Sequence, residues 1–487
     1  MQQLNNARLG QLKVATPNYD RSTLQAGIVH LGIGAFHRGH QADYTDQLMN
    51  SDGGNWGIVG ASLRSPGMRD LLQPQDGLYS LVENDGESQH IRIVGSIQRV
   101  LVAPESPEQL ITELANPAIK VVTLTITEKG YCHDPATGDI NWEHPDIIHD
   151  LQYFASQPKS AIGFLAAALI RRHSDNAAVT LLSCDNLSHN GRLLERVIKA
   201  FIERVCPEIL PWVDASVTFP CSMVDRIVPA VTEDDIERLS HTLGVFDAGA
   251  VFTESFCQWV IEDSFAAERP SWENAGALLV DDVSPFEEMK LRLLNGSHSL
   301  IAYLGVLAGF DFVHEVMENP TLKRWVRAYM DAVTPTLTIP DGFDIEDYKA
   351  QLCERFSNAS LRHRTLQIAM DGSQKIPQRW LPPLRQLLES NSADTSFFSL
   401  ALAGWIRFLH GLKDCGQTYR VDDPLYESLK KILSASDDAD VCQNILEYAP
   451  VFGNFFQNHP DFIEDVFNAY RSLCDVGVLQ TLSERGE

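Results

Sequence analysis

The chain has 487 residues, more than one ordinary hydrophobic core accommodates, so we expect two or three domains. Hydrophobic residues make up 44% and charged residues 21%, as in globular proteins, and no apolar run reaches the roughly 18 residues that a transmembrane helix needs. The formal net charge of −26 repels nucleic acid and excludes it as a partner, so an anionic substrate would require a local basic cluster.

The nine cysteines are odd in number and show no Cys-x-x-Cys spacing. This pattern argues against a disulfide framework and a zinc ribbon, and it favours a reducing compartment. The segment from Met1 to Asn6 lacks the basic and apolar regions of a secretory signal. We therefore expect a cytoplasmic protein with no bound metal and no membrane contact, as a monomer or a small homo-oligomer.

Strands and helices alternate in the first half of the chain. Apolar runs rich in β-branched residues predict buried strands at 27–33, 56–63, 120–126 and 178–183. Helical patterns occur between them, at 41–50, 107–114 and 162–172. Such alternation predicts an α/β fold with a parallel sheet.

The pattern changes near residue 284. Ser284, Pro285 and Glu287 have the order of a helix start, with a capping residue, a first-turn proline and a capping-box acid. Helical periodicity then dominates, at 285–308, 319–333, 345–355, 379–390, 396–411, 426–434 and 460–476. We therefore predict an α/β domain over 1–283 and a mostly α-helical domain over 284–487. Residues 391–395 are predicted to form a surface loop.

The strand at 27–33 runs into Gly32-x-Gly34. Glycines between a strand and a helix let the backbone approach a pyrophosphate, so Gly32 and Gly34 are candidate cofactor residues. The third glycine of the dinucleotide motif is replaced by His37, so an ordinary tight turn is the alternative. Arg38 follows as a further cofactor candidate. The segment from His37 to His40 fits phosphate and ribose contacts, or simple polarity at a helix start, better than it fits metal ligation.

The second strand ends in Leu63-Arg64-Ser65 and offers no carboxylate to a ribose. Two interpretations follow. Either other groups hold NAD, or Arg64 and Ser65 admit the additional phosphate of NADP. The third possibility is that Arg64 is only solvated.

Lys290, Asn295 and His298 lie on one short segment predicted to be helical. At about 100° per residue, Lys290 and Asn295 are about 140° apart around an α-helix and His298 falls between them. All three can therefore face one cavity. A lysine can accept a proton, an amide can donate to an alkoxide, and an imidazole can hold a hydroxyl, which together predict alcohol–ketone redox chemistry without a metal.

Two further candidates follow predicted strands or lie in apolar surroundings. Asn186 comes directly after the strand at 178–183, where it could point at a substrate oxygen or cap the next helix in an Asx turn. Asp225 precedes Arg226 in an apolar segment, and the pair could form a structural salt bridge.

A basic run stands out against the acidic chain. Arg362, His363 and Arg364 are consecutive, and Lys375 follows. Guanidinium groups bind carboxylates bidentately, so this run is a candidate anion anchor, although a solvated helix face is the usual explanation.

Together these segments resemble the polyol-specific long-chain dehydrogenase family, also called the mannitol dehydrogenase family, from about residue 27 to about residue 475. The matching motifs are those at 32–41, 125–132, 183–186 and 223–229 and Lys290-x4-Asn295-x2-His298. The resemblance implies an NAD-dependent enzyme with a Rossmann-like first domain and an active site in the cleft between the domains.

The resemblance also implies residue roles. Lys290 corresponds to the general base, Asn186 and Asn295 to the amide pair that stabilises the alkoxide, and His298 to the residue that orients the hydroxyl. Asp225 corresponds to a substrate-site or proton-relay carboxylate, and Gly32, Gly34 and Phe36 fall in the cofactor loop.

Two segments resemble the fructuronate reductase branch of this family: Glu128-Lys129-Gly130 and the stretch 355–375 with its Arg-His-Arg run. They imply interconversion of D-mannonate and D-fructuronate, with Arg362, Arg364 and Lys375 as carboxylate contacts. The segment 60–63 departs from the acidic second strand of that branch. A mannitol or arabinitol 2-dehydrogenase is therefore the first alternative, and a non-catalytic sensor of a sugar acid or dinucleotide is the second.

Overall fold

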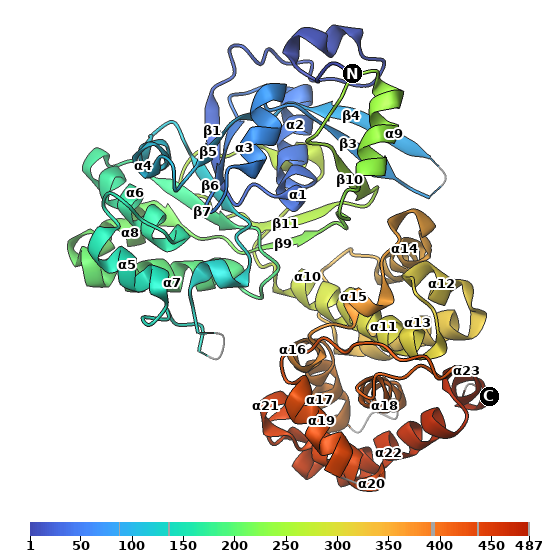
Figure 1. Cartoon of the computed structure of the whole chain (residues 1–487). Helices are drawn as coiled ribbons and strands as arrows, with labels where there is room; N and C mark the ends of the chain where they lie inside the picture. Colours follow the sequence, from blue (N-terminus) through green and yellow to red (C-terminus); the bar gives the residue numbers. More distant parts are fainter. Residues whose placement is uncertain (87, 135–136, 391–394, 436–437, 486–487) are drawn as a thin grey trace. The chain divides into compact units, whose positions relative to one another are not determined.

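The computed structural model describes residues 1–86, 88–134, 137–390, 395–435 and 438–485 (Figure 1). Its internal contacts divide the chain into two compact units, Met1–Ser284 and Pro285–Glu487. The first unit is α/β and the described part of the second is mostly helical, which confirms the predicted fold class. Of the loop predicted at 391–395, all but Thr395 lies outside the described residues.

A six-stranded parallel sheet forms the centre of the first unit. Its strands, in spatial order, are β5 (Ile97–Val102), β2 (Gly57–Ser62), β1 (Ala26–Leu31), β6 (Val121–Leu124), β7 (Val179–Ser183) and β8 (Val217–Thr218). The four predicted strands are β1, β2, β6 and β7. The chain order reverses between β1 and β6, which creates the topological switch point where such sheets bind ligands.

Side chains of β1 and β2 alternate between the two faces of the sheet, because successive residues of a strand point to opposite sides. Val29, Leu31 and Val59 pack against helices on one face, and Ile28 and Ile58 pack on the other. The first face is covered by α4 (Pro107–Ala115), α6 (Ala161–Asp175) and α7 (Asn190–Val205). The second is covered by α2 (Gln41–Asp52), β9 (Ser222–Asp225) and β11 (Gln258–Glu262). Burial on both faces explains why the strands are nearly continuous apolar runs.

Two three-stranded sheets complete this unit. One has the order β10 (Val251–Glu254), β3 (Tyr79–Asn84), β4 (Gln89–Val94), and the other has the order β12 (Leu278–Val280), β11, β9. The remaining helices are α1 (Ala35–Arg38), α3 (Gly67–Leu72), α5 (Pro145–Tyr153), α8 (Leu210–Ser216) and α9 (Glu233–Leu243). In Figure 1, α1, α2 and α3 lie on one side of the parallel sheet and α4, α6 and α8 on the other.

The second unit packs its helices around α11 (Gly296–Ala308), whose side chains are buried on nearly all sides. The helices before residue 390 are α10 (Ser284–Met289), α12 (Val313–Glu318), α13 (Pro320–Val333), α14 (Ile345–Ser357), α15 (Thr365–Ile368), α16 (Gly372–Arg379) and α17 (Leu381–Glu389). The later ones are α18 (Ser396–Phe408), α19 (Tyr426–Ala435), α20 (Asp438–Leu446), α21 (Ala449–Phe452), α22 (Pro460–Asp475) and α23 (Val478–Arg485).

The helix predicted at 285–308 is not one continuous α-helix. A π-helical segment, Lys290–Asn295, separates α10 from α11, so the prediction of uniform α geometry was wrong. The start also differs in detail. The helix begins at Ser284 itself, whose N–H donates to the Asp282 carboxylate at 2.9 Å.

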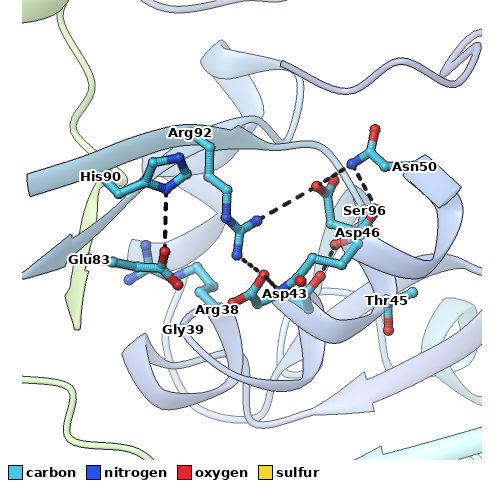
Figure 2. Close-up of polar contacts among 12 residues, drawn as sticks. Arg38, Gly39, Asp43, Thr45, Asp46, Asn50, Glu83, His90, Arg92 and Ser96 are labelled. Carbon is cyan, nitrogen blue, oxygen red and sulfur yellow. Dashed lines mark hydrogen bonds and ion pairs between the residues drawn. The ribbon is translucent and has the colours of Figure 1, made fainter. Parts of the chain in front are cut away.

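A buried ion network fixes α2 to the strands beside it (Figure 2). Arg92 of β4 pairs with Asp43 and lies 3.9 Å from Asp46, both on α2. Arg226, directly after β9, pairs with Asp43 at 2.7 Å and with Glu83 of β3 at 2.6 Å, and its side chain is fully buried. Buried charges are tolerated only when they are paired in this way.

Asp46 also accepts hydrogen bonds from the Tyr19 hydroxyl at 2.6 Å and the Gly95 N–H at 2.7 Å. Burial nevertheless raises the pKa of Asp46 to about 6, because the charged form is desolvated. An unfolded aspartate has a pKa of about 3.9. Between about pH 4 and pH 6, the folded protein therefore binds a proton that the unfolded chain does not. The free energy of unfolding falls as the pH rises through this range, and the loss is complete above about pH 6.

This sign gives a prediction for Asp46→Asn, which removes the titration. From pH 5 to pH 7.5, the stability of the unaltered protein relative to the variant should fall by about 1 kcal/mol. Chemical denaturation of both proteins at each pH measures the difference. A difference that is constant across this range would contradict the elevated pKa.

Candidate active site

A cavity of about 1240 Å³ opens at the carboxyl ends of the parallel strands. The residues that line it follow β1, β2, β5 and β6 or connect α5 to α6, and they include 32–34, 62–64, 103–105, 125–127 and 156–161. The cavity therefore lies at the switch point of the sheet, where a dinucleotide is bound in folds of this type.

Gly32 cannot be replaced without distortion. Its φ is +95°, and a Cβ added there would lie 2.1 Å from the Thr125 carbonyl oxygen of the neighbouring chain segment. Gly32 donates its N–H to the Ala61 carbonyl at 2.9 Å and accepts from the Thr125 hydroxyl at 2.9 Å. The ends of β1, β2 and β6 are thus drawn together at this glycine.

Gly34 differs from Gly32. Its φ is −103°, and an added Cβ would have no neighbour nearer than the Gly32 carbonyl oxygen at 3.8 Å. Both glycines line the cavity. Gly34 therefore leaves space for a phosphate group of a ligand to approach the protein backbone, which fits the predicted dinucleotide contact.

The other predicted cofactor residues have different surroundings. Arg64 is exposed and lines the cavity. Phe36 and Arg38 do not line it. Phe36 stacks on His40 with a ring separation of 5.1 Å, and the buried Arg38 donates to the carbonyls of Gly34 and Gly249. Arg38 thus binds the protein's own backbone.

Acidic side chains reach the cavity from outside the second strand. Glu105 and Glu108 are among its lining residues, but each pairs with an arginine: Glu105 with Arg69, and Glu108 with Arg171 at 2.8 Å. The end of β2 itself offers Ser62, Leu63 and Arg64, so the choice between NAD and NADP is not made by a strand-end carboxylate.

Asn186 is exposed three residues after the end of β7, at the same edge of the sheet. The preceding residue, Asp185, was overlooked in the sequence and is buried. Its carboxylate accepts from the N–H groups of Ile126 and Thr127, and burial raises its pKa. Its position after a predicted strand, next to Asn186, was the signal that could have revealed it.

Asp225 is the buried last residue of β9. Its neighbour Arg226 forms ion pairs with Asp43 and Glu83. Arg226 thereby anchors the chain immediately after Asp225, which fixes the position of this carboxylate.

Lys290 and Asn295 are the first and last residues of the π-helix. The Gly296 N–H donates to the Leu291 carbonyl, five residues earlier, which is the π pattern. In a π-helix, residues five apart lie on successive turns of the same face. In an α-helix they would be about 140° apart around the helix axis. The described helix therefore brings Lys290 and Asn295 closer in direction than predicted, and the Lys290 side chain is buried.

Tertiary contacts accompany this π turn. The Tyr329 hydroxyl of α13 donates to the Arg292 carbonyl at 3.1 Å, and the Trp380 indole donates to the Gly296 carbonyl at 3.2 Å. Arg292, the cation nearest to Lys290 in the sequence, directs its guanidinium to Thr336 and Gln386. Single π turns occur often at functional sites.

His298 is buried one turn further along, in α11. Its ring is 4.6 Å from that of Phe356 and 5.4 Å from that of His363. Burial, together with nearby His363, Arg379 and Arg355, holds the pKa of His298 well below its usual range. The imidazole is therefore neutral at physiological pH, so it has one donor and one acceptor nitrogen for a hydroxyl.

The predicted basic run is split between two environments. Arg362 and Arg364 are exposed, and each guanidinium lies 5.1 Å from the centre of the Phe312 ring. Lys375 is half-buried in α16 and donates to the Ile368 carbonyl at 3.3 Å, and burial lowers its pKa.

Arg379 was not predicted and lies one turn after Lys375 on α16. It donates to the Asn295 carbonyl at 3.1 Å and to the Ser299 hydroxyl at 2.9 Å. Its spacing of four residues from Lys375, which places both on one helix face, could have revealed it.

Metal and membrane features are absent from the part of the chain that the structure describes. No group of three or more His, Cys, Asp and Glu side chains has an arrangement suited to a metal ion. The search for a helix long and apolar enough to cross a membrane also found none among the described residues.

Family models match both units. The model of the mannitol dehydrogenase Rossmann domain matches residues 26–274, and that of the mannitol dehydrogenase C-terminal domain matches residues 282–474. The chain belongs to the mannitol dehydrogenase family. The predicted family and its oxidoreductase class are thereby confirmed.

Curated relatives and solved structures cover almost the whole chain. D-mannonate oxidoreductase of Escherichia coli (strain K12) is 42% identical, covering 97% of this chain and 98% of the relative. Mannitol 2-dehydrogenase of Aspergillus terreus is 39% identical, covering 98% of each. The structure of Pseudomonas fluorescens mannitol 2-dehydrogenase in a ternary complex with NAD and D-mannitol is 41% identical, with a TM-score of 0.86 and 99% of each chain covered.

The two glycines of the cofactor loop give a paired prediction. Gly32→Ala should destabilise the protein by about 2 kcal/mol or more, because both the positive φ and the Thr125 contact oppose a Cβ. Gly34→Ala should cost less than about 1 kcal/mol, since its Cβ meets open space. Chemical denaturation compares the two variants. Equal losses would contradict the described loop geometry.

Proposed function

We propose that this protein is an NAD-dependent oxidoreductase that interconverts D-mannonate and D-fructuronate. The observation that carries the proposal is the similarity to D-mannonate oxidoreductase over nearly the full length of both chains. It is supported by the two arginines near His298, Arg355 and Arg379, since the net charge of −26 would otherwise repel a sugar acid.

NAD is the proposed cofactor. The similar mannitol 2-dehydrogenase structure contains NAD. The cavity at the switch point is large enough for a dinucleotide and is lined by Gly32 and Gly34. Gly32, Gly34 and Arg64 are the residues that would contact it. When bound, NAD supplies the hydride acceptor for alcohol oxidation and, in its reduced form, the hydride donor for the reverse reaction.

We assign the proton chemistry to the second unit and to Asn186. Lys290 takes the proton from the substrate hydroxyl during oxidation, and neutral His298 holds that hydroxyl in place. The side-chain amides of Asn186 and Asn295 donate to the developing alkoxide. Asp225 contacts the substrate hydroxyls. This chemistry requires no metal ion.

A neutral polyol is the second candidate substrate class. Mannitol 2-dehydrogenases are nearly as similar to this chain as D-mannonate oxidoreductase is. In addition, Arg362 and Arg364 are exposed and lie against Phe312, an arrangement that also suits a purely structural role.

The first experiment measures NADH oxidation with D-fructuronate, D-tagaturonate and D-fructose in parallel, and repeats the series with NADPH. We expect the highest kcat/KM with D-fructuronate and NADH. A preference for D-fructose would move the protein to the neutral polyol branch. Absence of turnover with all three would contradict the proposed reaction and favour a binding function.

The carboxylate contacts are tested with Arg362→Ala and Arg364→Ala. Loss of one charge-assisted hydrogen bond should raise the KM for D-fructuronate about tenfold. Arg385→Ala is the matched control, because Arg385 is also an exposed arginine of this unit that lies over a ring, that of Phe455 at 5.2 Å. An unchanged KM in both test variants would show that the basic run does not bind the carboxylate.

Lys290→Ala tests the general base. We expect kcat to fall by a factor of about 10² to 10⁴, the usual contribution of such a group, with the affinity for NADH retained. NADH binding is measured separately by fluorescence titration. Loss of NADH affinity in this variant would mean that Lys290 acts in cofactor binding.

A further inference from the structure

Thr127 has a backbone conformation that a β-branched residue rarely adopts. Its φ of 62° and ψ of 164° fall in a region populated essentially by glycine. Thr127 follows the end of β6 and lines the cavity together with Thr125 and Ile126. Strained residues of this kind persist only where the surrounding structure holds them in place.

The group that holds Thr127 is the carboxylate of Asp185. One of its oxygens accepts from the Thr127 N–H at 2.8 Å, and the other accepts from the Ile126 N–H at 2.9 Å. The second oxygen also accepts from the Tyr131 hydroxyl at 2.7 Å. Asp185 and Tyr131 are both buried, so these bonds are shielded from water.

Asp185 also connects this segment to the adjacent strand end. It lies two residues after the end of β7 and immediately before Asn186, the proposed alkoxide donor. The Tyr131 hydroxyl in turn contacts the Ser183 hydroxyl, in the last residue of β7, at 2.5 Å. A single carboxylate thus sets both the cavity wall at Thr127 and the start of the turn that carries Asn186.

We propose that Asp185 is a positioning residue that keeps the strained Thr127 segment in the shape that binds the dinucleotide and aligns Asn186 with it. This inference rests on the proposed function. An amide cannot replace the carboxylate here, because two converging N–H groups require two acceptor oxygens and asparagine has one.

Asp247 offers a matched control in the same unit. It is a buried aspartate that also accepts from a backbone N–H, that of Gly249 at 2.8 Å, and from the Gln75 amide at 2.7 Å. Burial raises its pKa as it does that of Asp185. Asp247, Gly249 and Gln75 do not line the cavity.

The experiment is fluorescence titration of NADH into the unaltered protein, Asp185→Asn and Asp247→Asn, with the melting temperature of each variant recorded. Both variants should melt at lower temperature, because each loses an acceptor for a buried N–H. Only Asp185→Asn should show a weaker Kd for NADH, by about tenfold. Its kcat should fall as well, since Asn186 is displaced.

A rescue distinguishes positioning from general destabilisation. In Asp185→Asn/Thr127→Gly, glycine adopts the required conformation without strain, so most of the lost NADH affinity should return. Failure of the glycine to restore binding would contradict the role assigned to Thr127. If Asp185→Asn does not fold, Tyr131→Phe removes only one hydrogen bond to the carboxylate, and a Kd weakened a few-fold is then expected.

The possible failures are distinguishable. Asp185→Asn, or Tyr131→Phe in its place, with the Kd and kcat of the unaltered protein would overturn the positioning role and leave the proposed function intact. An equal loss of NADH affinity in Asp247→Asn would also overturn it, because the effect would then be one of stability. No NADH binding by the unaltered protein would contradict the proposed function and this inference together.

Discussion

The close approach of the chain at Gly32 to the Thr125 carbonyl is the constraint on which the rest of the first unit depends. Because Gly32 has no side chain, the ends of β1 and β6 can converge there, and a side chain at this position would collide with the Thr125 carbonyl. Asp185 binds the residues that follow Thr125 and thereby adds the end of β7 to the same assembly. The cavity at the switch point is a consequence of these backbone contacts, because they fix the segments that form its walls.

Charge is used differently in the two units of this acidic protein. In the first unit, Asp43 and Asp46 pair with the partly buried Arg92, and Asp43 also pairs with the buried Arg226, which secures α2 against its neighbouring strands. In the second, burial, together with nearby His363, Arg379 and Arg355, keeps the His298 imidazole neutral.

The π turn shows how tertiary packing determines the geometry between site residues that the sequence predicts. Lys290 and Asn295 are its two ends, and the Tyr329 hydroxyl and the Trp380 indole bind the backbone carbonyls within and just after it. These contacts come from α13 and from the junction of α16 and α17, both far along the chain. The direction of the proposed general base relative to the proposed amide donor therefore depends on residues with no chemical role of their own.

The sequence by itself determined the strand and helix periods, the change of pattern near residue 284 and the identity of the residues suited to redox chemistry, because these follow from local hydrophobic spacing and side-chain type. It did not determine β5, where Gln98 and Arg99 interrupt the apolar pattern, or the π geometry at Lys290. It also did not reveal Asp185 or Arg379, whose importance lies in the distant backbone groups that they bind. Only tertiary structure decides such contacts, because they join segments whose proximity has no local sequence signal.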